Sequence, residues 1–442
     1  MFAIARTKPS RRTGSSLALA IALASGTALG LVAFEAPAHA AKKKKKESAP
    51  KANYSKNFVK VYQTVNELLT GENADPVAAK AAVPGMLEQI ETDDDKRLAG
   101  SVLFNVGREN DDVAMQRRGF DMMIESGKVA ATELPQYLVN SGEFARQAGD
   151  YDAARARFAQ AIDAGYTGDL VSVVASTYFD NDQYAEGVKY LRQNIDKAAA
   201  AGKVPTEIWI DVGFSVAYNN DLVEDAIALS MQAIEYYPSD KNWANAFAVQ
   251  RNTLDMSDDI TLDLLRLAAA KGALSSDRDY SDYIQAADAI RLPGEVSRIL
   301  NEAVSKGVLK TSDPFVAEAK SASESRLSAD RAELPAYERD AKKPGAKPVA
   351  VNVAADLLYS YGEPAKAEEI YAIAATLPGL DSNRVMTRMG MAQVAQGKFA
   401  EAKETFAKVT GARAYVARLW STYADTQMEA EPALDAAPEA SS

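Results

Sequence analysis

The sequence predicts an all-α fold in which helical hairpins stack into a solenoid. Apolar and small residues recur at helical spacing through most of the chain. The stretch GDYDAARARFAQAI, which begins at Gly149, returns as GKFAEAKETFAKVT from Gly397. Small residues at 154, 187 and 226 and again at 367 and 402 are separated by 33, 39 and 35 positions, a period typical of helical repeats. The alternative is an ordinary helical bundle with coincidental alanines.

The first forty residues predict a secretory signal peptide. A basic start, Arg6 to Arg12, precedes the apolar run Leu17 to Phe34, and the small residues Ala38 and Ala40 follow. We expect cleavage after Ala40 or Ala41 and a periplasmic mature protein. The run is also just long enough for an uncleaved membrane anchor, which stays open as the alternative.

Composition excludes several classes of active site. The chain has no cysteine, and its one histidine, His39, lies in the signal peptide. Without histidine or cysteine there is no Ser-His-Asp triad and no ordinary zinc site. No glycine-rich phosphate loop is present. After residue 40 the chain keeps 46 basic and 60 acidic side chains, which disfavours nucleic acid. We therefore expect no enzyme, cofactor or metal, with a carboxylate-based hydrolase as the remaining catalytic alternative.

A basic segment follows the signal peptide. Residues 41–56 contain Lys42–Lys46 and few large apolar residues, so a disordered tether is expected. The lysine run is interpreted as a solvated tail, or alternatively as a contact with an anionic envelope surface.

Residues 57–339 are predicted to form the N-terminal repeat array. The segments KRLAGSVLFNVGREN and AMQRRGFDMMIESGK form an irregular pair, in which Asp93-Asp94-Asp95 opens a helix. Hairpins that match the repeat more closely follow. The stretches after Pro238 look like degenerate second helices of the same repeat. The turn at Asp180-Asn181-Asp182 resembles a calcium loop but lacks its glycine and glutamate, so a plain turn is preferred. The residues expected to pack the hairpins of this array are Gly142, Ala154, Phe158, Tyr178, Gly187, Trp209, Gly213, Ala226 and Pro238.

A break and a shorter array complete the chain. Residues 340–347 are predicted to be a linker, because Pro344 and Pro348 cannot continue a helix. Residues 348–426 form a repeat pair with a capping helix, and 427–442 form an acidic disordered tail. The packing residues expected in this pair are Ala367, Gly390, Ala402 and Phe406.

The hairpins resemble the tetratricopeptide-repeat family. The resemblance rests on Trp209-x-x-Val212-Gly213 with Ala226, Ala233 and Pro238, and on Gly149-Asp150-Tyr151 with the helix that follows. It covers about 135–238 and 348–410. The whole chain also resembles exported tetratricopeptide proteins of alphaproteobacteria, which implies the fold but no activity. Some family members clamp acidic peptides, but the matching positions carry Gln136, Val139, Glu143, Arg146 and Gln147, so that activity is not expected here.

Stacked hairpins present the outward side of their first helices as a binding surface. Phe179, Phe214 and Tyr359 are the aromatic candidates for anchoring a partner, with Glu143, Arg146 and Arg384 as charged candidates. The alternative is that these aromatic side chains pack against neighbouring helices. Further outward positions are expected at Glu207, Ile210, Asn352, Asp356, Thr387 and Met391.

The sequence thus favours an exported, non-catalytic scaffold that binds a protein or peptide in the cell envelope. The second hypothesis is a surface module that holds peptidoglycan, polysaccharide or anionic lipid through Lys42–Lys46 and exposed aromatic residues. The third is the carboxylate-based hydrolase.

Overall fold

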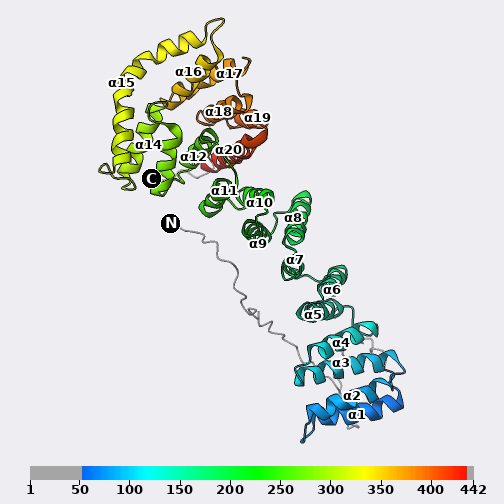
Figure 1. The fold of residues 1–442 in the computed structure, drawn as a ribbon. Helices are drawn as coiled ribbons and strands as arrows, with labels where there is room; N and C mark the ends of the chain where they lie inside the picture. Colours follow the sequence, from blue (N-terminus) through cyan, green and yellow to red (C-terminus); the bar gives the residue numbers. More distant parts are fainter. Residues whose placement is uncertain (1–51, 436–442) are drawn as a thin grey trace, which may run out of the picture. The chain divides into compact units, whose positions relative to one another are not determined.

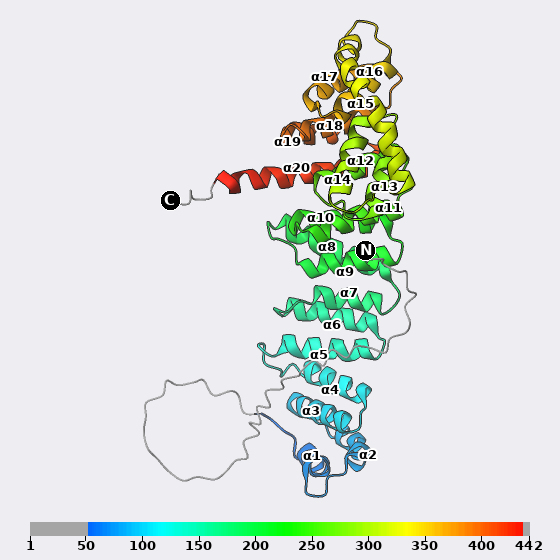
Figure 2. The same ribbon diagram turned by 90° about the vertical axis from the view of Figure 1, so that its left-hand side faces the viewer.

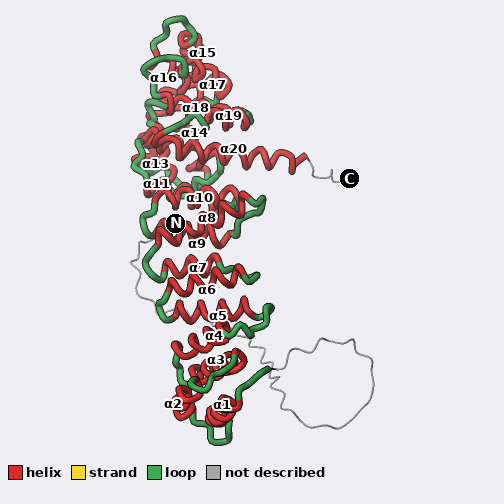
Figure 3. Tube along the Cα trace, turned by 90° about the vertical axis from the view of Figure 1, so that its right-hand side faces the viewer, coloured by secondary structure: helices red, strands yellow, loops and turns green. Residues whose placement is uncertain are grey.

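A computed structural model describes residues 52–435, which contain helices and short loops and no strand (Figure 3). The predicted signal peptide and Lys42–Lys46 lie outside the described residues. The chain divides into two compact units, Met1–Leu170 and Val171–Ser442. None of the helices in the described range is long and apolar enough to cross a membrane.

Unit 1 consists of three helical hairpins, and Figure 2 shows their layers from α1 to α6. Its helices are α1 (Lys56–Thr70), α2 (Pro76–Leu87), α3 (Asp93–Glu109), α4 (Val113–Glu125), α5 (Leu134–Gln147) and α6 (Tyr151–Asp163).

The start of α3 confirms that Asp93-Asp94-Asp95 opens a helix. Thr92 caps it, and the Asp95 side chain accepts hydrogen bonds from the backbone N–H of Thr92 and of Glu91. Asp95 is fully buried and also accepts from the N–H of Ser55, 3.0 Å away. The end of the predicted tether, from residue 52, is therefore held against α3.

Unit 2 continues the hairpin pattern and then departs from it (Figure 1). The helices of its first part are α7 (Val171–Phe179), α8 (Tyr184–Ala200), α9 (Glu207–Asn219), α10 (Val223–Tyr236), α11 (Asp240–Thr253), α12 (Asp258–Ala270), α13 (Asp277–Ala287) and α14 (Pro293–Ser305). The remaining elements are α15 (Pro314–Ala341), α16 (Pro348–Ser360), α17 (Pro364–Ala374), α18 (Ser382–Val394), α19 (Phe399–Phe406), the 3₁₀ turn η1 (Gly411–Arg413) and α20 (Ala414–Asp435).

The repeated stretches build the same contact twice. A side chain added at Gly142 would come within 2.6 Å of the Phe158 ring, and one added at Gly390 within 2.5 Å of the Phe406 ring. In both hairpins the ring stands sixteen positions after the glycine. The glycine of the first helix thus makes room for the ring of the second, which is why small residue and ring recur together.

The turn inside most of the described hairpins contains one residue with a positive φ. Gly149 and Gly397 supply it in the two matching hairpins, with φ of 76° and 75°. Asp182 and Asp221 supply it elsewhere, with φ of 55° and 57°. Aspartate tolerates this region better than most side chains. The acidic cluster at 180–182 is therefore an inter-helix turn, as expected.

The C-terminal hairpins fold back on the first part of unit 2. The 28-residue helix α15, yellow in Figure 1, leads away from α14, and α20 then lies beside α12 and α10. One buried apolar cluster joins α11–α14 to α18–α20. Within it the Tyr423 ring contacts Trp243 and Trp420, each 6.1 Å away between ring centroids. Figures 2 and 3 show the C-terminal end of α20 projecting beyond these helices.

Two predicted boundaries differ from the structure. The units meet at Leu170 and Val171, and the predicted linker 340–347 lies inside unit 2. Much of the segment before that linker is α15, which tolerates Pro335 in its interior. Helix α20 runs to Asp435, so it includes part of the predicted disordered tail.

Candidate interaction surfaces

The outward face of the C-terminal hairpins holds a helix of the same chain. Arg384 and Arg388 of α18 bind Asp259 of α12, with Nε–Oδ2 and Nη2–Oδ1 distances of 2.6 and 3.0 Å. Arg388 also reaches Asp263, Nε to Oδ1, at 3.1 Å. Arg413 of η1 donates to both aspartates. Arg291 also donates to Asp259 and Arg266 to Asp263, each at 3.1 Å, so two carboxylates one helical turn apart on α12 sit among five guanidinium groups.

Asp356 of α16 completes this arginine cluster. Arg388 Nη1 lies 2.9 Å from both of its carboxylate oxygens, and Arg384 Nη2 lies 2.7 Å from Oδ2. The Tyr371 hydroxyl donates to Oδ1 at 2.6 Å. Arg384 and Arg388 each bind both Asp356 of α16 and Asp259 of α12, so they connect these two helices.

A second ion pair extends the network into α14. Arg266 of α12 binds Glu295 through two parallel bonds, Nε–Oε1 at 2.7 Å and Nη2–Oε2 at 2.6 Å. Tyr283 also donates to Glu295 Oε1, at 2.7 Å, and both charged side chains are almost completely buried. The Arg266 guanidinium stands 5.1 Å from the centre of the Tyr359 ring.

The arginines keep these carboxyl groups ionised. Burial alone would raise the pKa of Asp259 and of Asp356, but the charges of Arg388 and Arg384 outweigh it and lower both pKa values. Burial likewise opposes ionisation of Glu295, yet Arg266 lowers its pKa. A carboxylic acid that donates a proton near neutral pH needs the opposite shift. Nor do residues 52–435 contain a group of three or more carboxylates or histidines placed to hold a metal ion.

These contacts correct the expectation that the C-terminal candidates face solvent. Arg384 and Tyr359 face α12 and its neighbours, and Tyr359 is half-buried, with desolvation raising its pKa to about 12. The other expected outward positions of α16 and α18 are buried as well: Asn352, Asp356, Thr387 and Met391. Helical periodicity placed all of them on one face correctly, but it could not reveal that α12 covers that face.

The N-terminal candidates are mostly placed against their own hairpins. Phe179 is half-buried over Gly187, where an added side chain would collide with its ring. Phe214 is half-buried and stacks on Tyr218 at 6.0 Å. Ile210, expected outside, is only 1 % exposed.

The charged candidates of α5 pair with each other. Glu143 and Arg146 form an ion pair at 3.0 Å on the surface of α5.

The expected packing residues lie largely inside. Ala154, Phe158, Ala226, Ala367 and Ala402 are fully buried and Phe406 nearly so. The glycines at 142, 187, 213 and 390 are buried too, while Trp209 and Tyr178 are half-buried. Pro238 is the exception, because it is exposed just after α10, where it ends the helix instead of packing.

The open side of α9 carries residues that the sequence did not single out. Ile208 is 52 % exposed, and the nearby Val204 is 66 % exposed. Ile208 lines a shallow depression of about 430 Å³ with Asp211, Val212, Ser215 and Glu207, and Glu207 is exposed as expected. The sequence signal was present, since 208, 211, 212 and 215 share one helical face. The sequence prediction placed Ile210 on the exposed side of the helix, whereas the exposed isoleucine is Ile208, two positions earlier.

Comparison with known proteins gives structural likeness only. No family model and no curated protein matches the sequence. The solved structures similar to it include the TPR2AB domain of yeast Sti1 in a pHSP90 complex, at 12% identity over 68% of this chain and 96% of that one, with a TM-score of 0.24. The TPR domain of P58(IPK) is 11% identical over 85% and 99%, with a TM-score of 0.20. Naa15/Naa10 bound to HypK-THB is 10% identical over 81% and 67%, with a TM-score of 0.23. The all-α fold of stacked helical hairpins therefore rests on the helices of this structure alone.

Proposed function

We propose that this chain is an exported, non-catalytic repeat scaffold that binds a protein or peptide partner in the cell envelope. The observation that carries the proposal lies in unit 2, where the outward face of α16 and α18 already holds the helix α12. On α9 a different face, which carries Ile208, is open. A fold that binds a helix of its own on one first-helix face is suited to bind a partner segment on another.

The α9 surface, formed by Val204, Ile208, Asp211, Val212 and Ser215, sets the chemistry of that partner. Its apolar part consists of the side chains of Ile208 and Val204, which are both more than half exposed. Its polar part is acidic, although Asp211 already pairs with Lys241 of α11 at 3.0 Å. The surface therefore suits a helix that presents an aliphatic stripe, as helix-in-groove recognition requires.

Site-directed photocrosslinking in cells tests this surface. A photoreactive residue at Ser215 is expected to give a discrete adduct with one envelope protein, and Ile208→Asp is expected to abolish it. Glu224→Lys, a charge change near the start of the next helix, serves as the matched control and keeps the adduct. The adduct persisting in Ile208→Asp would reject the α9 surface, and its absence from the unsubstituted protein would reject the proposal.

Export is tested separately. The mature protein is expected in the periplasmic fraction with its N-terminus at Ala41 or Lys42. Recovery of the full-length chain with the inner membrane would instead support the uncleaved anchor. Recovery with a glycan or lipid pellet, lost when Lys42–Lys46 is deleted, would favour the surface-module hypothesis.

A further inference from the structure

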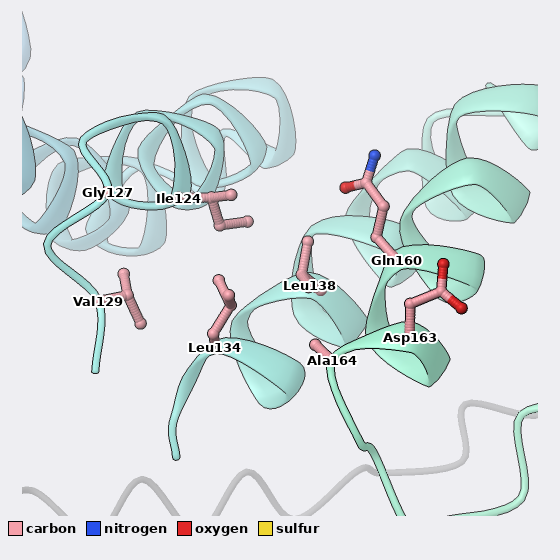
Figure 4. Close-up of a pocket in the computed structure, with 8 residues that line it drawn as sticks. All are labelled: Ile124, Gly127, Val129, Leu134, Leu138, Gln160, Asp163 and Ala164. Carbon is pink, nitrogen blue, oxygen red and sulfur yellow. The ribbon is translucent and has the colours of Figure 1, made fainter. Parts of the chain in front are cut away.

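Unit 1 contains an apolar groove that none of its own side chains fills. It has a volume of about 450 Å³ and lies between the end of α4, the start of α5 and the end of α6 (Figure 4). Leu138, 4 % exposed, forms part of its lining. Figure 4 shows the half-buried side chains of Ile124, Val129 and Leu134 gathered on one side, with Gln160 and Asp163 of α6 on the other.

The apolar walls are held in place by the ends of the helices. The Ser126 hydroxyl donates to the Met123 carbonyl at 2.6 Å and accepts from the Lys128 N–H at 3.1 Å. Gly127 then reverses the chain with φ of 64°. Residues 126–133 thereby separate α4 from α5 and leave Val129 beside the groove. A surface of this kind is pre-formed, as binding pockets usually are.

The groove lining contains one charged side chain, the exposed Asp163 of α6. Outside the lining, Glu133 at the start of α5 and Lys128 in the loop before Val129 are also exposed. The nearest basic candidate on α6, Arg157, is already bound to Asp121 at 2.8 Å and to Gln160 at 3.1 Å. Residues 52–170 as a whole carry 19 acidic and 12 basic side chains. An acidic ligand would be repelled here, and a cationic one attracted.

We infer that this α4–α6 groove is a docking site for a cationic segment of a partner protein, which inserts an aliphatic side chain between Ile124 and Leu134 and sets a lysine or arginine against Asp163. The inference extends the proposed scaffold function to a second surface, on unit 1. Apolar burial supplies the affinity, and the charge selects the sequence around the inserted side chain.

Peptide binding to the purified protein tests the inference. The probe is a fluorescein-labelled amphipathic peptide of leucine and lysine, and the comparison is the same peptide with glutamate in place of lysine. Fluorescence anisotropy is expected to give at least tenfold tighter binding of the lysine peptide. Val129→Asp and Asp163→Lys are each expected to weaken it about tenfold. Val129 lies in a loop but packs against the cluster of Phe104, Phe120, Met123 and Phe144, so circular dichroism of the variant must show unchanged helix content.

A charge-matched control separates docking from general attraction to an acidic protein. Glu72→Lys makes the same charge change in unit 1 outside the groove lining, and it is expected to leave binding within about twofold of the unsubstituted protein. Equal loss in Glu72→Lys and Asp163→Lys would overturn the inference, as would equal binding of the two peptides. Loss of peptide binding in Ile208→Asp alone would place the site on α9, which supports the scaffold proposal and rejects this groove.

Discussion

Arg388 in α18 binds Asp263 in α12, 125 residues earlier in the chain, with its Nε 3.1 Å from the carboxylate Oδ1. The same guanidinium also holds Asp356 and Asp259. One buried cation therefore connects three helices that belong to different hairpins.

Arg388→Ala is expected to destabilise unit 2 by about 3–5 kcal/mol, because it leaves buried carboxylates without part of their counter-charge. Urea unfolding followed by circular dichroism measures the loss. The control is Arg339→Ala at the exposed end of α15, whose pair with Asp340 lies at the surface and should contribute little. Equal unfolding midpoints for the two variants would mean that the arginine cluster is energetically unimportant.

Acid is expected to weaken the same cluster. Asp259, Asp356 and Glu295 have folded-state pKa values below their ordinary ones. Their contribution is fully present above the unfolded pKa values, about 4, and is lost as the pH falls toward the lower folded values. Stability should therefore drop steeply below about pH 5. Thermal unfolding measured from pH 7 to pH 3 should show a smaller fall in melting temperature for Asp259→Asn than for Glu72→Gln. Glu72 is the control, because its carboxyl is exposed between α1 and α2. Parallel curves for the two variants would contradict this assignment.

The glycine–ring contact makes a prediction about repeat packing. Gly390→Ala is expected to destabilise the α18–α19 hairpin by about 1–3 kcal/mol, since the new methyl group would press on the Phe406 ring. Phe406→Leu in the same chain should recover part of that loss by making room. Double-mutant unfolding measurements give the coupling. Strictly additive effects would show that the two residues do not interact.

Asp95 and Asp93 are two positions apart, but replacing each with alanine should lower the free energy of unfolding by very different amounts. Burial alone would raise the pKa of Asp95, yet the hydrogen bonds from Ser55, Glu91 and Thr92 lower it. Asp95→Ala leaves these backbone donors without their acceptor and should cost about 1–3 kcal/mol. Asp93→Ala removes an exposed acid and should cost far less. Hydrogen exchange at residues 53–58 should rise in Asp95→Ala; unchanged protection there would mean that the chain start is held by other contacts.

Local chemistry made the hairpins predictable. The helical spacing and the packing residues of each hairpin, such as Gly390 and Phe406, depend on residues close in sequence, so period and residue type were sufficient to predict them. The position of the C-terminal hairpins was not predictable in this way. That arrangement depends on Arg388 and Arg413 meeting aspartates more than a hundred residues away, and surface arginines on a helix give the same sequence pattern whether solvent or another helix faces them.

The candidate site shows the same limit. Arg384 and Tyr359 were correctly grouped on one face, but that face is internal. Ile208 was overlooked because the expected register placed Ile210 outside, and the packing of α9 against α8 and α10 decides which side of the helix stays open. The α4–α6 groove arises from three helix ends and one loop, and a periodic pattern contains no information about such a junction.

The return of the C-terminal hairpins to α12 has a consequence for the order of folding. The chain leaves the ribosome, and any export channel, from its N-terminus. Asp259, Asp263 and Glu295 emerge long before Arg388 and Arg413, so unit 2 cannot complete its buried core until nearly the whole chain is available. Closing so long a loop is slow. Unit 1 has no such dependence, because its hairpins contact near neighbours in sequence, and a chain cut short before residue 388 would keep a folded first unit attached to an incomplete second.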